Sequence, residues 1–235
     1  QARELTQLQS TLQNQIEKFG GHVFAEGAMV IPGSTGLDTQ YYSLKLASTF
    51  ASETVDPAQY FNATTPVTLT GETSGVTAVV VGFDIATTTD QPTLYLRYLA
   101  TGTDNISAVF ADGENISADA GITHTTSYSS NIASATTFTS TFSAAAGSSA
   151  ANLTSSTGPA SRKGSAITIQ AGVYYIRGMF TLCSEETLVL EKYKTTPSYR
   201  VGFTITETLV TPESDTTLLD NSTGSSNFAA KGAHR

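Results

Sequence analysis

The sequence has 235 residues, of which 39% are hydrophobic and 14% charged, and its net charge at pH 7 is −8. An acidic chain whose largest basic cluster is Arg162-Lys163 is poorly suited to nucleic acid, because phosphate recognition depends on clustered positive charge. No apolar run approaches the roughly 20 residues of a membrane-spanning helix, and a single cysteine, Cys183, excludes a disulfide bond within the chain. Abundant Ser and Thr, with 10 Tyr and 11 Phe to supply a core, favour a mainly β protein.

Residues 1–21 are predicted to form an α-helix that serves oligomerisation. Ala2 to Phe19 contains neither Gly nor Pro, and Gly20-Gly21 is expected to end the helix. Its apolar residues form one narrow stripe: Leu5, Leu8, Leu12, Ile16 and Phe19. This spacing repeats after eleven residues, which favours a nearly straight or slightly right-handed bundle. The stripe either folds back on its own domain or packs in a bundle with other chains, and its narrowness and terminal position favour the bundle.

Residues 22–64 are predicted to supply the first strands of a main β domain, into which residues 65–122 insert a small all-β domain. In the inserted part, short apolar runs alternate with turns such as Gly71 to Gly75 and Asp112-Gly113, a pattern typical of a small barrel. We expect this part to fold on its own and to make few contacts with the C-terminal strands.

Residues 123–165 are rich in Ser, Thr and Ala and are predicted to be a low-complexity arm or linker. Their few apolar side chains do not offset an ordering cost of about 1–2 kcal/mol per residue, so we expect little regular structure and support from neighbouring subunits.

Residues 166–235 are predicted to form an antiparallel meander of the main β domain, followed by an irregular C-terminal segment. Gly172 to Leu182 is expected to be one strand that is buried on both faces. Tyr199 to Leu209 alternates between apolar and polar residues, a period that places one strand face on a core. The residues expected on that buried face are Tyr199, Val201, Phe203 and Ile205. The predicted fold class is therefore mainly β: an N-terminal oligomerising α-helix, then an antiparallel β-sheet domain with an inserted small β-barrel-like domain.

No pattern of residues in the sequence points to catalysis, a metal or a cofactor. The histidines His22, His124 and His234 lack the spacing of metal ligands. The acidic pairs Glu185-Glu186 and Asp112/Glu114 fall on predicted turns, where carboxylates are usually solvated. Arg177, on an otherwise apolar run, is expected to pair with Glu191 or Glu207 in a structural role.

Several stretches of the sequence resemble an uncharacterised family of virion structural proteins from tailed bacteriophages, including phages of cyanobacteria. The most specific are Ala171-Gly-Val-Tyr-Tyr-Ile-Arg-Gly-Met-Phe180, Leu188-Val-Leu-Glu-Lys-Tyr193, Thr196-Pro-Ser-Tyr-Arg-Val-Gly202, Leu218-Leu-Asp-Asn221, Gly224-Ser-Ser-Asn-Phe-Ala-Ala230 and Gly232-Ala-His-Arg235. Thr70-Gly-Glu-Thr-Ser-Gly-Val76 and Ala111-Asp-Gly-Glu114 are similar to small β-units of fibre-like phage proteins. The resemblance spans most of the chain outside 123–163, and members of the family are usually longer, so Arg235 is not expected to be the natural end.

The resemblance implies a structural component of a phage tail, fibre-like or baseplate-proximal, that is located in the virion and acts by assembly rather than catalysis. Its implied partners are copies of itself, most simply in a homotrimer, and other tail or baseplate proteins; it implies no cofactor and no catalytic residue. Two other classes stay open at this point: a carbohydrate-binding adhesin module, and an enzyme such as a glycan depolymerase. Exposed aromatic residues grouped on one domain would support the adhesin, and two carboxylates about 10 Å apart or closer in a cleft would support the enzyme.

Overall fold

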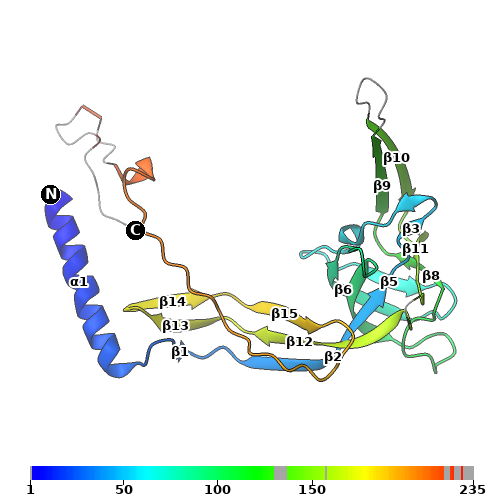
Figure 1. The fold of residues 1–235 in the computed structure, drawn as a ribbon, viewed down its shortest axis with the longest axis horizontal. Helices are drawn as coiled ribbons and strands as arrows, with labels where there is room; N and C mark the ends of the chain where they lie inside the picture. Colours follow the sequence, from blue (N-terminus) through cyan, green and yellow to red (C-terminus); the bar gives the residue numbers. More distant parts are fainter. Residues whose placement is uncertain (1, 130–136, 157, 220–222, 225–228, 230–235) are drawn as a thin grey trace. The chain divides into compact units, whose positions relative to one another are not determined.

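The computed structural model describes residues 2–129, 137–156, 158–219, 223–224 and 229 (Figure 1). It confirms a mainly β chain with antiparallel sheets, and α1 is the one α-helix of the described part. The chain divides into two compact units. Unit 1 comprises Gln1–Gly36, Thr168–Thr187 and Tyr199–Arg235, and unit 2 comprises Leu37–Ile167 and Leu188–Ser198. The chain passes between them within β2 (Thr35–Lys45), β12 (Ser161–Ile169) and β15 (Glu186–Glu191), and after Ser198.

Unit 2 contains most of the strands. They are β3 (Thr49–Phe50), β4 (Glu53–Thr54), β5 (Thr68–Gly71), β6 (Thr77–Asp84), β7 (Thr93–Ala100), β8 (Asn115–Ala118), β9 (Ile122–Ser129), β10 (Thr137–Ala144) and β11 (Ser149–Asn152), with a 3₁₀-helix η1 (Pro57–Tyr60). Eight strands form one sheet in the order β11-β8-β5-β6-β7-β2-β12-β15. This sheet is open, and no sheet in the described part of the chain is closed, so the expected barrel is not observed. The strands of residues 65–122 instead belong to the same sheet as β2, β11, β12 and β15. Within this sheet, β7 pairs with β2 and β8 pairs with β11.

The core of unit 2 is well packed. Its largest fully buried apolar side chains are Leu44, Leu46, Tyr60, Leu69, Val76, Val80, Leu94, Ile116, Ile122 and Leu153. Polar side chains also lie in this interior: Glu114 is 5% exposed, and the expectation of a solvated carboxylate there is wrong. Its carboxylate accepts hydrogen bonds from the backbone N–H groups of Thr73, Ser74 and Ala111 and from the Ser74 hydroxyl, at 2.6–3.0 Å. These four donors replace the water that the carboxylate loses, so Glu114 organises the Gly71 to Gly75 turn.

The Ser/Thr/Ala-rich stretch 123–164 is regular where the structure describes it, and the expectation of little regular structure is wrong. β9 and β10 form an antiparallel hairpin that pairs Ile122 with Ala144 and continues to Ser129 and Thr137. β11 and the first part of β12 also lie in this stretch. Thr and Ser fit strands because they bond across the pair, as Thr123 Oγ1 does with Ser143 Oγ at 3.2 Å. The hairpin is also held to the rest of unit 2, because Ile122, His124 and Ala144 are buried there.

His124 is fully buried beneath Tyr60. The backbone N–H of Asp56 donates to His124 Nδ1 at 3.2 Å, so Nδ1 carries no proton, and Nε2 lies 3.0 Å from the carbonyl oxygen of Ala150. The Tyr60 hydroxyl donates to the same carbonyl at 2.9 Å. Burial lowers the pKa of His124, because the charged imidazolium loses its hydration there.

We therefore expect unit 2 to lose stability as the pH falls through the ordinary histidine range. The unfolded chain takes up a proton at His124 near pH 6.5, whereas the folded chain does so only at a lower pH, so acid favours unfolding by up to about 1.4 kcal/mol at pH 5.5. The measurement is urea unfolding at pH 7.5 and at pH 5.5. His124→Gln, which keeps a donor and an acceptor, should lose this part of the pH dependence, and His22→Gln on the exposed helix should keep it. An unchanged pH dependence in His124→Gln would contradict the assignment.

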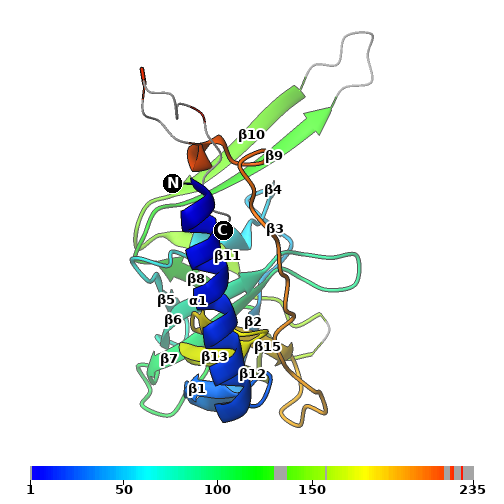
Figure 2. The same cartoon turned by 90° about the vertical axis from the view of Figure 1, so that its left-hand side faces the viewer.

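Unit 1 consists of α1 (Ala2–Val23), a three-stranded sheet in the order β1-β13-β14 and a 3₁₀-helix η2 (Thr216–Leu218). The strands are β1 (Met29–Ile31), β13 (Gly172–Ile176) and β14 (Met179–Cys183). The helix does not end at Gly20-Gly21 as expected but continues to Val23 as one helix (Figure 2). Two glycines lower helix propensity by about 1 kcal/mol each, and contacts made by Gly20 with the β13–β14 hairpin, described below, offset that cost.

The run Gly172 to Leu182, expected to be one strand, is a hairpin. Ile176 pairs with Met179 across a two-residue turn in which Arg177 and Gly178 have φ values of 46° and 81°. Two positive φ values in a two-residue loop are typical of a type I′ turn, whose twist matches that of the two strands it joins. The turn was missed because Arg is an uncommon residue in the left-handed region, unlike Asn or Asp.

The expected buried face at Tyr199, Val201, Phe203 and Ile205 is also wrong. Residues 199–210 belong to no strand, and Tyr199, Phe203 and Ile205 are 45–60% exposed. The alternation identified residues that suit a buried strand face, but the described part of the chain does not bury them.

Candidate assembly surface

The apolar stripe of α1 is exposed along the helix. Leu8, Leu12, Ile16 and Phe19 are between 45% and 68% exposed, whereas the Leu5 side chain lies outside the described residues. Val23 continues the stripe at 57% exposure and lies eleven residues after Leu12, the same offset that relates Leu8 to Phe19. The sequence contained this signal, but Val23 was missed because the helix was expected to end before it.

The base of α1 is fixed to the hairpin by Tyr175. This side chain is only 3% exposed, and its hydroxyl donates to the backbone carbonyl of Glu17 at 2.9 Å. Its ring lies directly against Gly20, where a Cβ atom would come within 2.3 Å of a ring carbon. Contacts that close are not found between real atoms, so position 20 must be glycine for the ring to occupy this place.

Three aromatic rings surround this contact. Phe24, just beyond the helix, lies 5.7 Å from the ring centroids of both Tyr175 and Phe180, and Tyr175 lies 5.5 Å from Phe180. Tilted and edge-to-face pairs at these distances are favourable beyond the area they bury. The cluster holds the last turn of α1 and the segment after it on the face of the hairpin that carries Tyr175.

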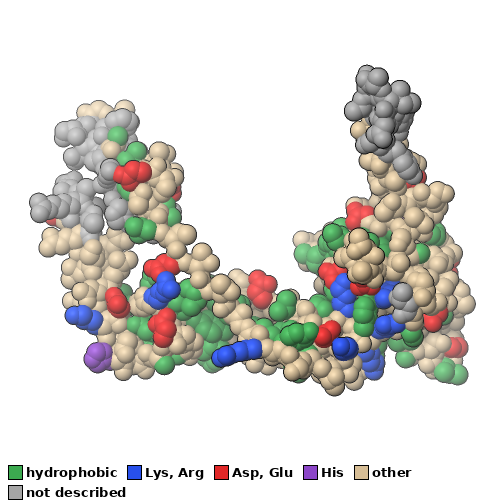
Figure 3. Space-filling model, viewed as in Figure 1, with side chains coloured by type: hydrophobic (Ala, Val, Ile, Leu, Met, Phe, Trp, Pro, Cys, Tyr) green, Lys and Arg blue, Asp and Glu red, His purple; other side chains and the backbone are tan. Residues whose placement is uncertain are grey.

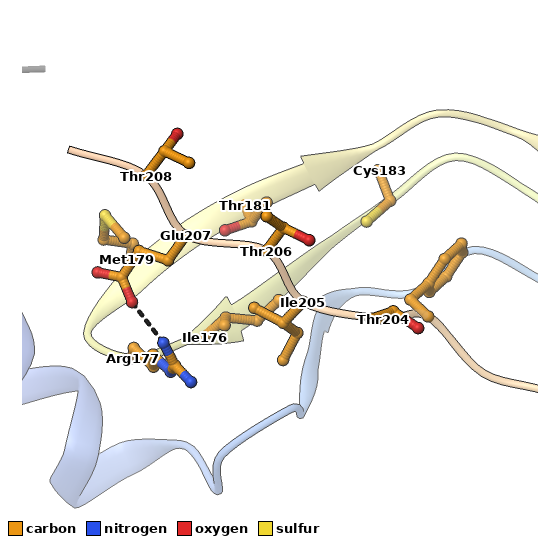
Figure 4. A pocket seen from close by; sticks show the side chains of 11 residues that line it. Ile176, Arg177, Met179, Thr181, Cys183, Thr204, Ile205, Thr206, Glu207 and Thr208 are labelled. Atoms are coloured by element: carbon orange, nitrogen blue, oxygen red, sulfur yellow. Dashed lines mark hydrogen bonds and ion pairs between the residues drawn. The ribbon is translucent and has the colours of Figure 1, made fainter. Parts of the chain in front are cut away.

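The hairpin turn adds polar contacts. The backbone N–H of Arg177 donates to the Glu26 carboxylate at 3.0 Å, and the Arg177 guanidinium pairs with Glu207, which confirms one of the two expected partners (Figure 4). The side chains of that ion pair are 61% and 50% exposed, so it contributes little to stability. Gly178 lies against Glu17 of α1, where a Cβ would come within 2.7 Å of the glutamate side chain.

Apart from this contact, unit 1 has almost no interior. In its described part, the buried apolar residues other than glycine are Tyr175 and Pro212. Its large apolar side chains with substantial exposure are Leu8, Leu12, Ile16, Phe19, Val23, Met29, Ile31, Met179, Phe180, Leu182, Tyr199, Phe203, Ile205 and Leu209. Hydrophobic side chains are accordingly visible on the surface over β13 and β14 (Figure 3). Exposed apolar residues in this number are unusual for a monomer and mark an interaction surface.

Other kinds of site find less support in the described residues. In that part of the chain, no three His, Cys, Asp or Glu side chains lie close enough together to hold a metal ion. His22 is on α1 and His124 is in the core of unit 2, while His234 lies outside the described residues. The helix that the structure describes lacks the length and apolar composition needed to cross a membrane.

We expect Gly20→Ala to release the base of α1 from the hairpin, because the new methyl group overlaps the Tyr175 ring. Gly21→Ala is the matched control: its Cβ would lie 3.7 Å from the Tyr175 hydroxyl, an ordinary contact, and it gains the same helix propensity of about 1 kcal/mol. Amide hydrogen exchange in residues 17–27 should speed up roughly tenfold or more in Gly20→Ala and stay equal or slow down in Gly21→Ala. Equal protection in both variants would show that the Tyr175 contact does not hold the helix.

Comparison of the sequence with protein-family models and with curated proteins finds no match, and comparison of the structure with solved structures finds none. The described residues of unit 1 form an anchored helix with an exposed apolar stripe, in a unit that buries one large hydrophobic side chain. This arrangement suits association with other chains better than chemistry on a small molecule.

Proposed function

We propose that the chain is a structural component of a bacteriophage tail, fibre-like or baseplate-proximal, that functions by assembling with copies of itself and with other tail proteins. The observation that carries the proposal is the exposed stripe on α1, within a unit that lacks a core of its own. The resemblance to virion proteins adds the location. The proposed residues of oligomerisation are Leu5, Leu8, Leu12, Ile16 and Phe19, to which the structure adds Val23.

The area of this surface is sufficient for a stable complex. A half-exposed Leu, Ile or Phe side chain presents on the order of 100 Å² of apolar surface, so the stripe alone offers roughly 500 Å². The exposed residues of β14 and of 199–209 raise the total beyond the roughly 800 Å² that each partner contributes to a standard interface.

The charge distribution favours copies of the same chain as partners. The whole protein carries a net charge of −8, which opposes self-association, but α1 carries two acidic and two basic side chains: Arg3, Glu4, Glu17 and Lys18. Helices from several copies can therefore approach one another without net repulsion. The eleven-residue offset of the stripe suits a nearly straight bundle, and we propose three helices, with a mixed bundle of tail proteins as the alternative.

A carbohydrate-binding module receives less support. Such a site would use exposed aromatic rings grouped in a folded domain. Among the described residues, the exposed large apolar side chains of unit 2 are all aliphatic: Leu37, Val81, Ile85, Leu99, Ile106, Val109 and Leu188. The aromatic side chains that the structure describes as exposed lie in unit 1, together with the aliphatic residues of the proposed interface.

The test is to replace Leu8 and Leu12 together with Asp and to measure the mass in solution by light scattering. We expect the parent protein to be an oligomer and the double variant to fall toward the mass of one chain, 24.6 kDa. Each buried Leu contributes roughly 1.5–3 kcal/mol, and burying an unpaired carboxylate in its place adds a further cost.

The matched control is Ser10→Asp with Asn14→Asp. These positions are exposed, have the same spacing and charge change, and lie on the opposite side of the helix. The control should keep the parent mass. A parent protein that is already monomeric, or a Leu8/Leu12 variant of unchanged mass, would contradict the proposed role of the helix.

A further inference from the structure

The outer edge of β14 is free and has no protection against strand pairing. β14 is the last strand of the order β1-β13-β14, so among the described residues no strand neighbours the side of Met179–Cys183 that faces away from β13. Exposed edges in soluble proteins usually carry Lys, Pro or a bulge that discourages pairing with another chain. Met179-Phe-Thr-Leu-Cys183 has no charge and no Pro, and Met179, Phe180 and Leu182 are 46–74% exposed. Such an edge indicates a position for a further strand.

The same unit contains a segment with the properties of that strand. Residues 200–210 make no backbone hydrogen bond to another described residue, although they contain no Pro and alternate apolar and polar residues. Phe203, Ile205 and Leu209 are 45–70% exposed. An extended run with unpaired backbone groups and one apolar face can add to a sheet edge, where the backbone supplies affinity and alternate side chains supply specificity.

Within one chain this segment does not pair with the β14 edge. It crosses the face of the hairpin that carries Ile176, Met179 and Cys183, and leaves a cavity of about 420 Å³ between them (Figure 4). Among the described residues, its ion-pair and ring contacts with that hairpin are the exposed Arg177–Glu207 pair and an edge-to-face contact between Phe203 and Tyr174, with centroids 5.8 Å apart. Little interaction is therefore lost if the segment leaves this face.

We propose that residues 200–210 of one copy add as a β-strand to the outer edge of β14 in a second copy. Every copy then carries both halves of the contact, a free edge and a strand to fill another. A head-to-tail contact of this kind closes into a ring when the rotation between copies permits, without any further partner. The inference rests on the proposed self-assembly and adds a second interface to that of α1.

Cys183, the only cysteine of the chain, lies on β14 and can report the pairing. Two differently tagged chains are expressed together: one is the parent, and the other carries Cys183→Ser with one new cysteine at position 201, 202, 203, 204, 205 or 206. After mild oxidation, a disulfide between the two tags requires Cα atoms about 4.4–6.8 Å apart. Consecutive residues of a strand lie about 3.3 Å apart and point to opposite faces, so a paired strand brings one of the six positions into range of Cys183, and the positions just before and after it should cross-link far less. Ile106→Cys, at the most exposed apolar side chain of the described residues, is the control for random collision.

The outcomes separate this inference from the proposed function when the mass of each mixture is measured by light scattering. A cross-link between the two tags that is confined to one position, and is weak at the positions on either side of it, supports the added strand. An oligomer that forms no such cross-link, or forms it equally at all six positions and at residue 106, overturns the added strand and leaves assembly through α1 intact. A monomeric protein overturns the proposed assembly and the added strand with it.

Discussion

The attachment of α1 to the β13–β14 hairpin depends on the absence of a side chain at position 20. Gly20 lets the Tyr175 ring lie against the helix backbone, and the Tyr175 hydroxyl then reaches the carbonyl of Glu17. Phe24 and Phe180 pack around that ring, and the hairpin turn beyond it brings Gly178 against Glu17. One aromatic side chain therefore anchors the helix, while the stripe that begins in its first turns is left uncovered. A helix of this length with no packed apolar face is only marginally stable in water, and the proposed assembly would add the packing that it lacks.

The two units reach stability by different routes. Unit 2 buries a continuous set of Leu, Val, Ile and Tyr side chains and provides hydrogen-bond partners for the buried side chains of Glu114 and His124. Unit 1 orders its backbone at a cost of about 1–2 kcal/mol per residue but leaves the corresponding apolar side chains in water. Association can recover this deficit, because each Leu, Ile or Phe that becomes covered contributes roughly 1.5–3 kcal/mol. In this account the hydrophobic core of unit 2 forms within one chain, whereas unit 1 obtains its core by association with neighbouring chains.

Features that depend on the spacing of apolar residues along the chain could be predicted from the sequence. Features that depend on contacts between distant residues could not. The α1 stripe from Leu8 to Phe19 and the mainly β fold followed from spacing and composition, and the Arg177–Glu207 pair from an isolated charge on an apolar run. Gly20 was misread as a helix stop because its role depends on a ring 155 residues further along the chain. The stretch 123–164 was expected to be irregular, but its strands are held by hydroxyl pairs and by a core that other segments supply. The alternation at Tyr199 to Ile205 marked an apolar face, yet alternation alone does not say which chain covers it.

The central claim is that unit 1 obtains its core from other copies of the chain. Amide hydrogen exchange of one sample at high and at low protein concentration tests it most directly, with the mass of each sample determined in parallel. The account predicts that α1 and β14 are protected in the concentrated sample and exchange rapidly after dilution to single chains. Strands β5, β6 and β7 of unit 2 should exchange equally slowly in both, because their core is complete within one chain. Protection of α1 that is the same in single chains as in the concentrated sample would contradict the account.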